Sequence, residues 1–277
     1  MALGLFGAGA VAKSFLSRVP GLPRQLGPVG APSFRLASRI VNSMGAGYAV
    51  KSVEEFDRCR ALLIAVPDKI LPAVLSRLQE ARINWGGRSI LLCDSGEDSR
   101  VLAPFRKAGA AGASIHPLDG QASRFVVEGD APAVREAKHL VRELKGQALE
   151  LNSEKMPLYL AGQSLGSGLF LPLAAACMEC IAAATDSVPT AMRITEALYQ
   201  QSLRAFMHAG KKGWSGSLAS GDQPAVLREL DALGEADPAL ARLYRELAVF
   251  ALVWSHRHPA LLQKLRDYPL READAAD

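Results

Sequence analysis

The first half of the chain alternates between short apolar runs and longer segments in which apolar positions follow a helical repeat. The apolar runs are bounded by glycine, proline or polar residues, which predicts strands at 2–6, 25–30, 61–66, 89–93, 113–115 and 125–128. The helical repeats predict helices at 11–19, 70–81, 99–108 and 131–144. This alternation is typical of the α/β class, and it predicts a Rossmann-like doubly wound parallel sheet that binds its ligand across the carboxyl ends of the strands.

From residue 153 onward no strand pattern recurs, and helical periodicity predicts helices at 153–184, 190–210, 224–233 and 238–268. We therefore expect two domains, a Rossmann-like domain over 1–152 and an all-helical domain over 153–277. The first of these helices is long enough to span a membrane, but Pro172, Glu179 and three nearby glycines favour a buried helix. Because four helices cannot bury all of this apolar surface, a homodimer through the helical domain is expected.

A glycine-rich turn, Gly7-Ala8-Gly9-Ala10-Val11-Ala12, joins the first predicted strand to the first predicted helix. Gly7 permits the tight turn, and Gly9 lets a phosphate group approach the backbone. The helix that follows offers the N–H groups of Ala10 and Val11 and the positive end of its dipole. The order of strand, glycines and helix predicts a dinucleotide site, with an ordinary strand-to-helix turn as the alternative.

The residues after the second strand favour NADP over NAD. Sites of this kind use a carboxylate about 20 residues after the glycines to bind the ribose 2′-hydroxyl, yet the first acidic residue of the chain is Glu54. Ser33, Arg35 and Arg39 stand there instead, and guanidinium groups bind phosphate oxygens in bidentate fashion. These three residues are the candidates for the 2′-phosphate, and a solvated basic helix face is the alternative.

Polar residues also follow three later strands, as Val66-Pro67-Asp68, Asp94-Ser95-Gly96 and His116-Pro117. Because the carboxyl ends of parallel strands meet at one edge of a sheet, we expect the first of these segments to line the cofactor and the others to face it. Alternatively, the acidic and serine side chains of these segments cap the helices that follow.

Composition narrows the function further. A net charge of +4 without a basic run argues against nucleic acid, and the chain opens without a charged leader. Four cysteines in 277 residues form no disulfide framework, so a cytoplasmic protein is expected. Cys177 and Cys180 are interpreted as buried thiols, and His256 and His258 as solvated, so no metal site is predicted.

Five motifs follow one another along the chain in a characteristic order. They are the glycine-rich turn, the strand end at 65–68, Ser95-Gly96, the stretch Ser114-Ile-His-Pro-Leu118, and Lys155 with Tyr159. In this order they resemble bacterial proteins that join a Rossmann-like domain to a C-terminal helical domain of unknown function. That family is similar to pyrroline-5-carboxylate reductase, ketopantoate reductase and the deazaflavin-dependent NADP oxidoreductases. The resemblance implies NADP binding, a helical domain of the phosphogluconate dehydrogenase C-terminal type, and a reductase activity.

The chain departs from the family pattern at several polar positions. The family tends to carry histidines where Asp94 and Leu160 stand, an asparagine near Gly168 and an arginine at Ser220. Either the substrate differs, or the chemistry has been lost.

The arrangement is also similar to that of the β-hydroxyacid dehydrogenases, in which an interdomain lysine is the acid. By that resemblance Lys155 donates the proton, Ser95 and Tyr159 orient the substrate, and His116 is the competing acid. Alternatively Lys155 is solvated, Tyr159 belongs to the core and His116 stabilises a rigid turn. Two functions remain open: an NADP-dependent oxidoreductase that reduces a small carbonyl or imine between the domains, or a catalytically decayed NADP-binding regulatory or scaffold protein.

Overall fold

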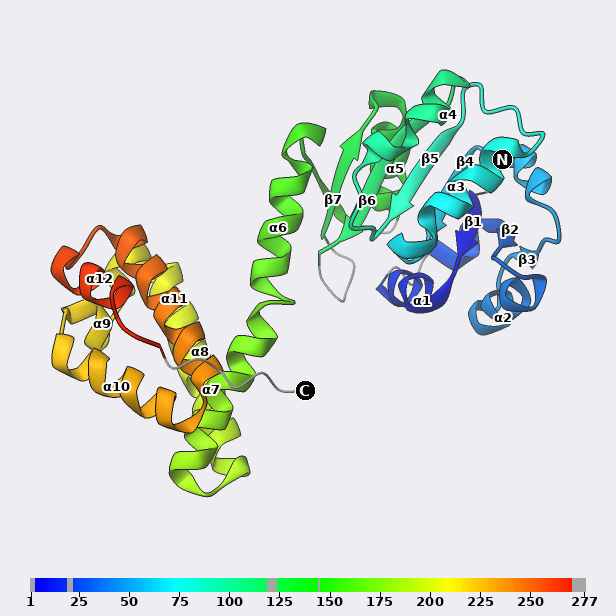
Figure 1. Cartoon of the computed structure of the whole chain (residues 1–277). Coiled ribbons are helices and arrows are strands. Elements are labelled where there is room, and N and C mark those ends of the chain that lie inside the picture. Colours follow the sequence, from blue (N-terminus) through cyan, green and yellow to red (C-terminus); the bar gives the residue numbers. More distant parts are fainter. Residues whose placement is uncertain (1–2, 19–21, 119–123, 144, 271–277) are drawn as a thin grey trace. The chain divides into compact units, whose positions relative to one another are not determined.

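The computed structural model describes residues 3–18, 22–118, 124–143 and 145–270. The chain divides into two compact units, Met1–Ser164 and Leu165–Asp277. The first unit contains the sheet, and the second contains only helices among its described residues (Figure 1). The division falls within helix α6 (Met156–Gly166), slightly later than the domain boundary expected at 152/153.

The sheet of the first unit has eight strands in the order β3-β2-β1-β4-β5-β6-β7-β8, which is the order of a dinucleotide-binding sheet with two added edge strands. The strands are β1 (Leu3–Gly7), β2 (Leu26–Gly30), β3 (Tyr48–Ala49), β4 (Ala61–Ala65), β5 (Ser89–Cys93), β6 (Ala111–Pro117), β7 (Arg124–Gly129) and β8 (Gln147–Glu150). All neighbours pair in parallel except β6 and β7, which pair antiparallel. The expected doubly wound parallel sheet is confirmed, and the one antiparallel pair arises because residues 118–123 are too few for a crossover connection.

Helices cover both faces of this sheet (Figure 1). They are α1 (Gly9–Arg18), α2 (Phe34–Met44), α3 (Leu71–Glu80), α4 (Ala103–Lys107) and α5 (Ala131–Glu143). Side chains alternate across each strand, so Leu63 packs into the core that α1 and α5 share, while Leu62 and Ile64 pack into the core beneath α3 and α4. The unbroken burial of β1, β4 and β5 explains why their sequences are continuous apolar runs.

The second unit is helical throughout its described residues. Its helices are α7 (Phe170–Thr185), α8 (Val188–Ala209), α9 (Ser217–Ser220), α10 (Gln223–Ala236), α11 (Pro238–Ser255) and α12 (Pro259–Arg266). The single helix expected over 153–184 is interrupted at 167–169. Pro172 lies in the first turn of α7, where its missing N–H leaves no helical bond unmade. Asp222 caps α10 by accepting from Ala225 N at 3.1 Å.

Two details differ from expectation. Cys177 and Cys180 are only half-buried in α7, where they line an apolar cavity of about 340 Å³ with residues of α10 and α11. His258 is not simply solvated, because its Nε2 lies 3.0 Å from the carbonyl oxygen of Ala219. All four cysteines are free, and the described residues contain no cluster of His, Cys, Asp and Glu that could hold a metal ion.

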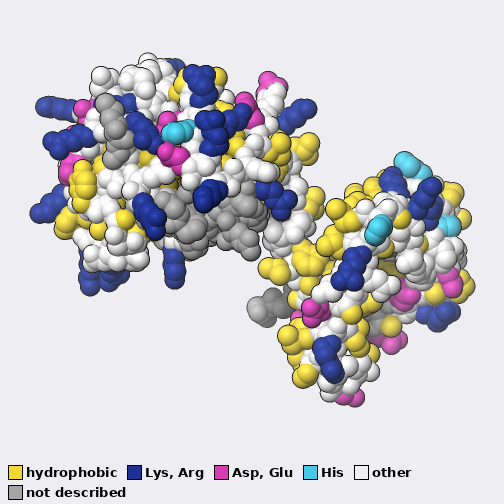
Figure 2. All heavy atoms as spheres, turned by 180° about the vertical axis from the view of Figure 1, so that it is seen from behind, with side chains coloured by type: hydrophobic (Ala, Val, Ile, Leu, Met, Phe, Trp, Pro, Cys, Tyr) yellow, Lys and Arg dark blue, Asp and Glu magenta, His cyan; other side chains and the backbone are white. Residues whose placement is uncertain are grey.

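Helices α6 and α7 carry a large apolar surface. Within 153–185 an 18-residue window has a mean hydropathy of 1.7 and no buried residue, so by length and composition alone this segment could cross a membrane. Figure 2 shows hydrophobic side chains over much of the helical unit on the face drawn. The exposed large apolar residues of α7 and α8 are Phe170, Leu171, Val188, Met192, Ile194, Leu198, Leu203, Phe206 and Met207.

Candidate functional site

The glycine turn lies where β1 and β4 end side by side, since Gly7 pairs with Ala65 and Ala8 N donates to the Ala65 carbonyl at 3.0 Å. Gly9 has φ +60°, and a Cβ there would lie 3.3 Å from Pro67 Cγ. A Cβ on Gly7 would lie 3.1 Å from Cβ of Ala12. Close packing therefore requires glycine at both Gly7 and Gly9. Helix α1 begins at Gly9, and the N–H groups of its first turn have no acceptor within the helix. This geometry suits a diphosphate.

A group of exposed cations surrounds the end of β2. Ser33 caps α2 by accepting from Leu36 N at 3.3 Å, which leaves its O–H able to donate to a ligand. Arg35 lies in the first turn of α2 and Arg39 one turn later, and both are exposed. Sequence reasoning missed Lys51, which follows β3 and whose Nζ lies 5.4 Å from the centre of the Phe34 ring. The structure thus adds a third cation near the positions expected to bind a phosphate.

The segments after β4 and β5 are joined by the Asp68 carboxylate. Ser95 Oγ donates to Asp68 Oδ1 at 2.6 Å, and Gly96 N donates to Oδ2 at 3.0 Å. Asp68 therefore accepts hydrogen bonds from the segment after β5 and does not cap the helix that follows it. Val66 is buried and Pro67 contacts the glycine turn, so the structure brings the segment 66–68 to the turn as expected.

His116 and Tyr159 meet at the same edge of the sheet. His116, on β6, is only 1% exposed, and its ring centre lies 6.5 Å from that of Tyr159 on α6 at an interplanar angle of 64°. Burial, with a smaller contribution from the charge of Asp94, raises the pKa of the Tyr159 hydroxyl. Among the residues that the structure describes, Tyr159 Oη is buried and has no hydrogen-bond partner.

An unpaired buried hydroxyl costs about 1–3 kcal/mol, so this atom identifies a position where a polar group of a ligand would stabilise the protein. The interpretation of Tyr159 as an ordinary core tyrosine leaves this cost unexplained. The site therefore combines a phosphate cradle with a hydroxyl that can donate to a small polar molecule.

Lys155 stands apart from this pair. It ends the short turn Ser153–Lys155 before α6, and it is exposed. Its ammonium group forms no hydrogen bond or ion pair with any described residue. The solvated alternative for Lys155 is thus the better description of this structure.

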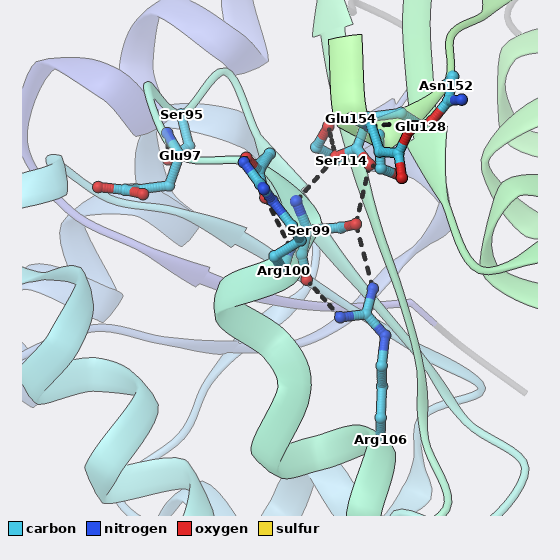
Figure 3. A network of polar contacts seen from close by, with 11 residues as sticks. Ser95, Glu97, Ser99, Arg100, Arg106, Ser114, Glu128, Asn152 and Glu154 are labelled. Carbon is cyan, nitrogen blue, oxygen red and sulfur yellow. Dashed lines mark hydrogen bonds and ion pairs between the residues drawn. The ribbon is translucent and has the colours of Figure 1, made fainter. Parts of the chain in front are cut away.

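Sequence reasoning also missed Ser114 and Glu128, which lie next to His116. His116 Nε2 lies 3.2 Å from Ser114 Oγ. Ser114 Oγ in turn donates to Glu128 Oε1 at 2.7 Å, and Figure 3 shows these two side chains. The available signal was a glutamate that interrupts the apolar pattern of a predicted strand.

The strand order, the glycine turn after β1 and the helices that follow the sheet define a Rossmann-like dinucleotide-binding fold with a C-terminal helical region. Residues 123–250 match the model of a family described as a domain of unknown function (DUF2520). No curated protein matches the chain in sequence.

Solved structures share the fold at low sequence identity. A candidate NADP oxidoreductase from Bacteroides fragilis is 14% identical, covers 92% of this chain and 98% of its own, and has a TM-score of 0.69. An imine reductase from Myxococcus stipitatus in complex with NADP⁺ is 14% identical over 96% of this chain and 93% of its own, with a TM-score of 0.64. A reductive aminase from Aspergillus terreus in complex with NADPH and ethyl-5-oxohexanoate is 15% identical, covers 96% of this chain and 90% of its own, and has a TM-score of 0.59. These similarities establish the fold.

Proposed function

We propose that this protein is an NADP-dependent oxidoreductase that reduces a small carbonyl or imine compound. The observation that carries the proposal is the buried Tyr159 hydroxyl, which lies beside His116 and has no hydrogen-bond partner among the described residues. The relatives of the same fold support it, because they include an imine reductase crystallised with NADP⁺ and a reductive aminase crystallised with NADPH.

The residues of the first unit fit NADP. Gly7, Gly9 and the N–H groups of Ala10 and Val11 would hold the diphosphate, since the turn leaves no room for a side chain. The residues that would bind the 2′-phosphate are Ser33, Arg35 and Arg39. The bound cofactor would supply the hydride, and the protein must supply a proton and hold the substrate.

For the proton, the geometry favours His116 over Lys155. The imidazole contacts Tyr159 and is buried, whereas Lys155 is exposed and lacks a partner in the described part of the chain. In this proposal Tyr159 Oη would donate a hydrogen bond to the carbonyl oxygen or imine nitrogen, and His116 would supply the proton that the same oxygen or nitrogen gains on reduction. Ser95, already bound to Asp68, keeps the β4 and β5 ends in place beside the substrate.

The test is NADPH oxidation with 2-keto acids, aldehydes and cyclic imines, measured for the wild type and three variants. His116→Asn and Tyr159→Phe should each lower kcat by about 10²-fold with NADPH affinity unchanged, because positioned acid groups contribute about that much. Lys155→Ala should lower kcat by less than about threefold if the lysine is solvated. A large loss in Lys155→Ala with a small one in His116→Asn would reverse the assignment of the proton donor.

One observation favours a catalytically decayed NADP-binding regulatory or scaffold protein. Asp94, Leu160 and Ser220 stand where the resembled family carries polar pocket residues. Tight NADPH binding without turnover of any of the three substrate classes would support this second function and contradict the first.

We also propose that the helical unit forms a homodimer. Large apolar residues are exposed on both α7 and α8, among them Leu171 at 68%, and exposed apolar patches mark interaction sites. A membrane is the alternative partner, since the segment 153–185 could cross one by length and composition, but the exposed Glu179 on α7 favours a protein partner.

Sedimentation without detergent should give twice the chain mass of 29.5 kDa. Leu171→Glu should shift the protein toward the monomer, whereas Leu149→Glu on the edge strand β8 should not. A monomeric wild type, or one that sediments only with added lipid, would contradict the dimer.

A further inference from the structure

Glu128 is a fully buried acid outside the residues assigned above. It lies on β7 with 0% exposure, and its two carboxyl oxygens receive four hydrogen bonds. Ser99 N at 2.8 Å and Ser114 Oγ at 2.7 Å bind Oε1, while Ser99 Oγ at 2.8 Å and Ser153 Oγ at 2.5 Å bind Oε2. Figure 3 shows the side chains of Ser99, Ser114 and Glu128 converging. A buried carboxylate with so many donors is held in one orientation.

The charged groups determine which atom donates in each hydrogen bond around Glu128. Arg106 Nη2 donates to Ser99 Oγ at 3.1 Å, so the Ser99 hydroxyl must use its own hydrogen toward Glu128. The Ser99 backbone N–H is also a donor, so both carboxyl oxygens act as acceptors, and the nearby guanidinium offsets the buried negative charge.

The same reasoning extends to His116. The Ser114 hydroxyl has one hydrogen, and it is directed at Glu128. The oxygen of Ser114 can therefore only accept from the imidazole, so the proton of the 3.2 Å contact belongs to His116 Nε2.

We propose that Glu128 is a positioning residue that acts through Ser114 to fix the protonated nitrogen of His116, and through Ser153 to fix the turn before α6. The second contact matters because α6 carries Tyr159, and its first residue, Met156, is fully buried. One carboxylate thus holds the two elements whose side chains meet at the site. The catalytic part of this role rests on the proposed function, whereas the protonation of His116 does not.

The test begins with long-range ¹H–¹⁵N spectra of the whole ¹⁵N-labelled protein at a pH where the imidazole is neutral, with the His116 signals assigned from His116→Asn. In the wild type, Nε2 should carry the proton. Ser114→Ala removes the acceptor at Nε2, so the preference for a proton on Nε2 should weaken. In Glu128→Gln the amide oxygen can still accept from Ser114 and Ser99 N, so Nε2 should stay protonated.

Ser153→Ala is the matched control, since it removes one bond to Glu128 without touching Ser114 or His116. In this variant Nε2 of His116 should still carry the proton, as in the wild type. A wild-type proton on Nδ1, or an unchanged tautomer in Ser114→Ala, would overturn the proposal.

Kinetics separates this inference from the proposed function. Ser114→Ala should lower kcat by at least about tenfold with the KM for NADPH unchanged, because a misplaced proton weakens general acid catalysis. A tautomer change without any change in kcat would overturn the catalytic role of Glu128. Absence of activity in the wild type, with the expected spectra, would instead contradict the proposed function and leave the His116 assignment standing.

Discussion

The substitution Gly9→Ala tests whether the turn after β1 is shaped for a diphosphate. Gly9 has φ +60°, which an alanine adopts at a cost of about 1–2 kcal/mol. The new Cβ would also lie 3.3 Å from Pro67 Cγ, so Pro67 must shift away from its place at the end of β4. The variant should therefore lose both stability and the close approach of a phosphate to the backbone.

Gly45→Ala supplies a matched control. Gly45 ends α2 with φ +64°, so the backbone strain is the same, but a Cβ there meets no atom within 4 Å. Both variants should lose about 1–2 kcal/mol of unfolding free energy, or roughly 2–8 °C in Tm for a unit of this size. Only Gly9→Ala should weaken NADPH binding, by about tenfold or more, which corresponds to about 1.4 kcal/mol.

The assays are thermal unfolding without cofactor and fluorescence titration with NADPH at a temperature where both variants are folded. Wild-type NADPH affinity in Gly9→Ala would refute the assignment of this turn. An equal loss of affinity in both variants would show that strain, and not the cradle, determines binding.

Two further predictions concern buried polar groups. Tyr159→Phe removes a hydroxyl that has no partner among the described residues. Without ligand, the free energy of unfolding in urea should therefore rise by about 1 kcal/mol. A fall in this free energy would contradict the assignment of the Tyr159 hydroxyl to a ligand site. Burial raises the pKa of the Cys59 thiol from 9.0 to about 11, against the opposing charge of Arg88, so in this interval the folded chain keeps a proton that the unfolded chain loses. The free energy of unfolding should decline from about pH 9 to 11, less steeply in Cys59→Ala than in the wild type, and equal slopes would contradict this reasoning.

Much of the fold could be read from the sequence, because buried parallel strands are continuous apolar runs. The strand Ser89–Cys93 has the bounds predicted for it. The strands at 3–7, 26–30 and 61–65 each begin and end within one residue of their own predicted bounds. The edge strands β3 and β8 were missed because their residues are exposed or half-buried, so no apolar run marks them. Strand direction is not encoded in periodicity, although the short connection before β7 could have indicated the antiparallel pair.

The site was predictable only where local sequence determines it. The glycine turn depends on neighbouring residues, and it has the expected geometry. The bonds from Ser95 to Asp68 and from Ser114 to Glu128 join residues 27 and 14 positions apart, which no local pattern reveals. The exposure of Lys155 likewise depends on where the chain enters α6.

The most direct test of the account compares NADPH and NADH binding to the wild type, to Arg35→Ala and to Arg77→Ala. Arg77 is an exposed arginine on α3 and serves as the control. We expect the wild type and Arg77→Ala to bind NADPH at least about tenfold more tightly than NADH, and Arg35→Ala to lose most of this preference through NADPH alone. Equal binding of the two cofactors by the wild type would contradict the central claim that this sheet binds NADP.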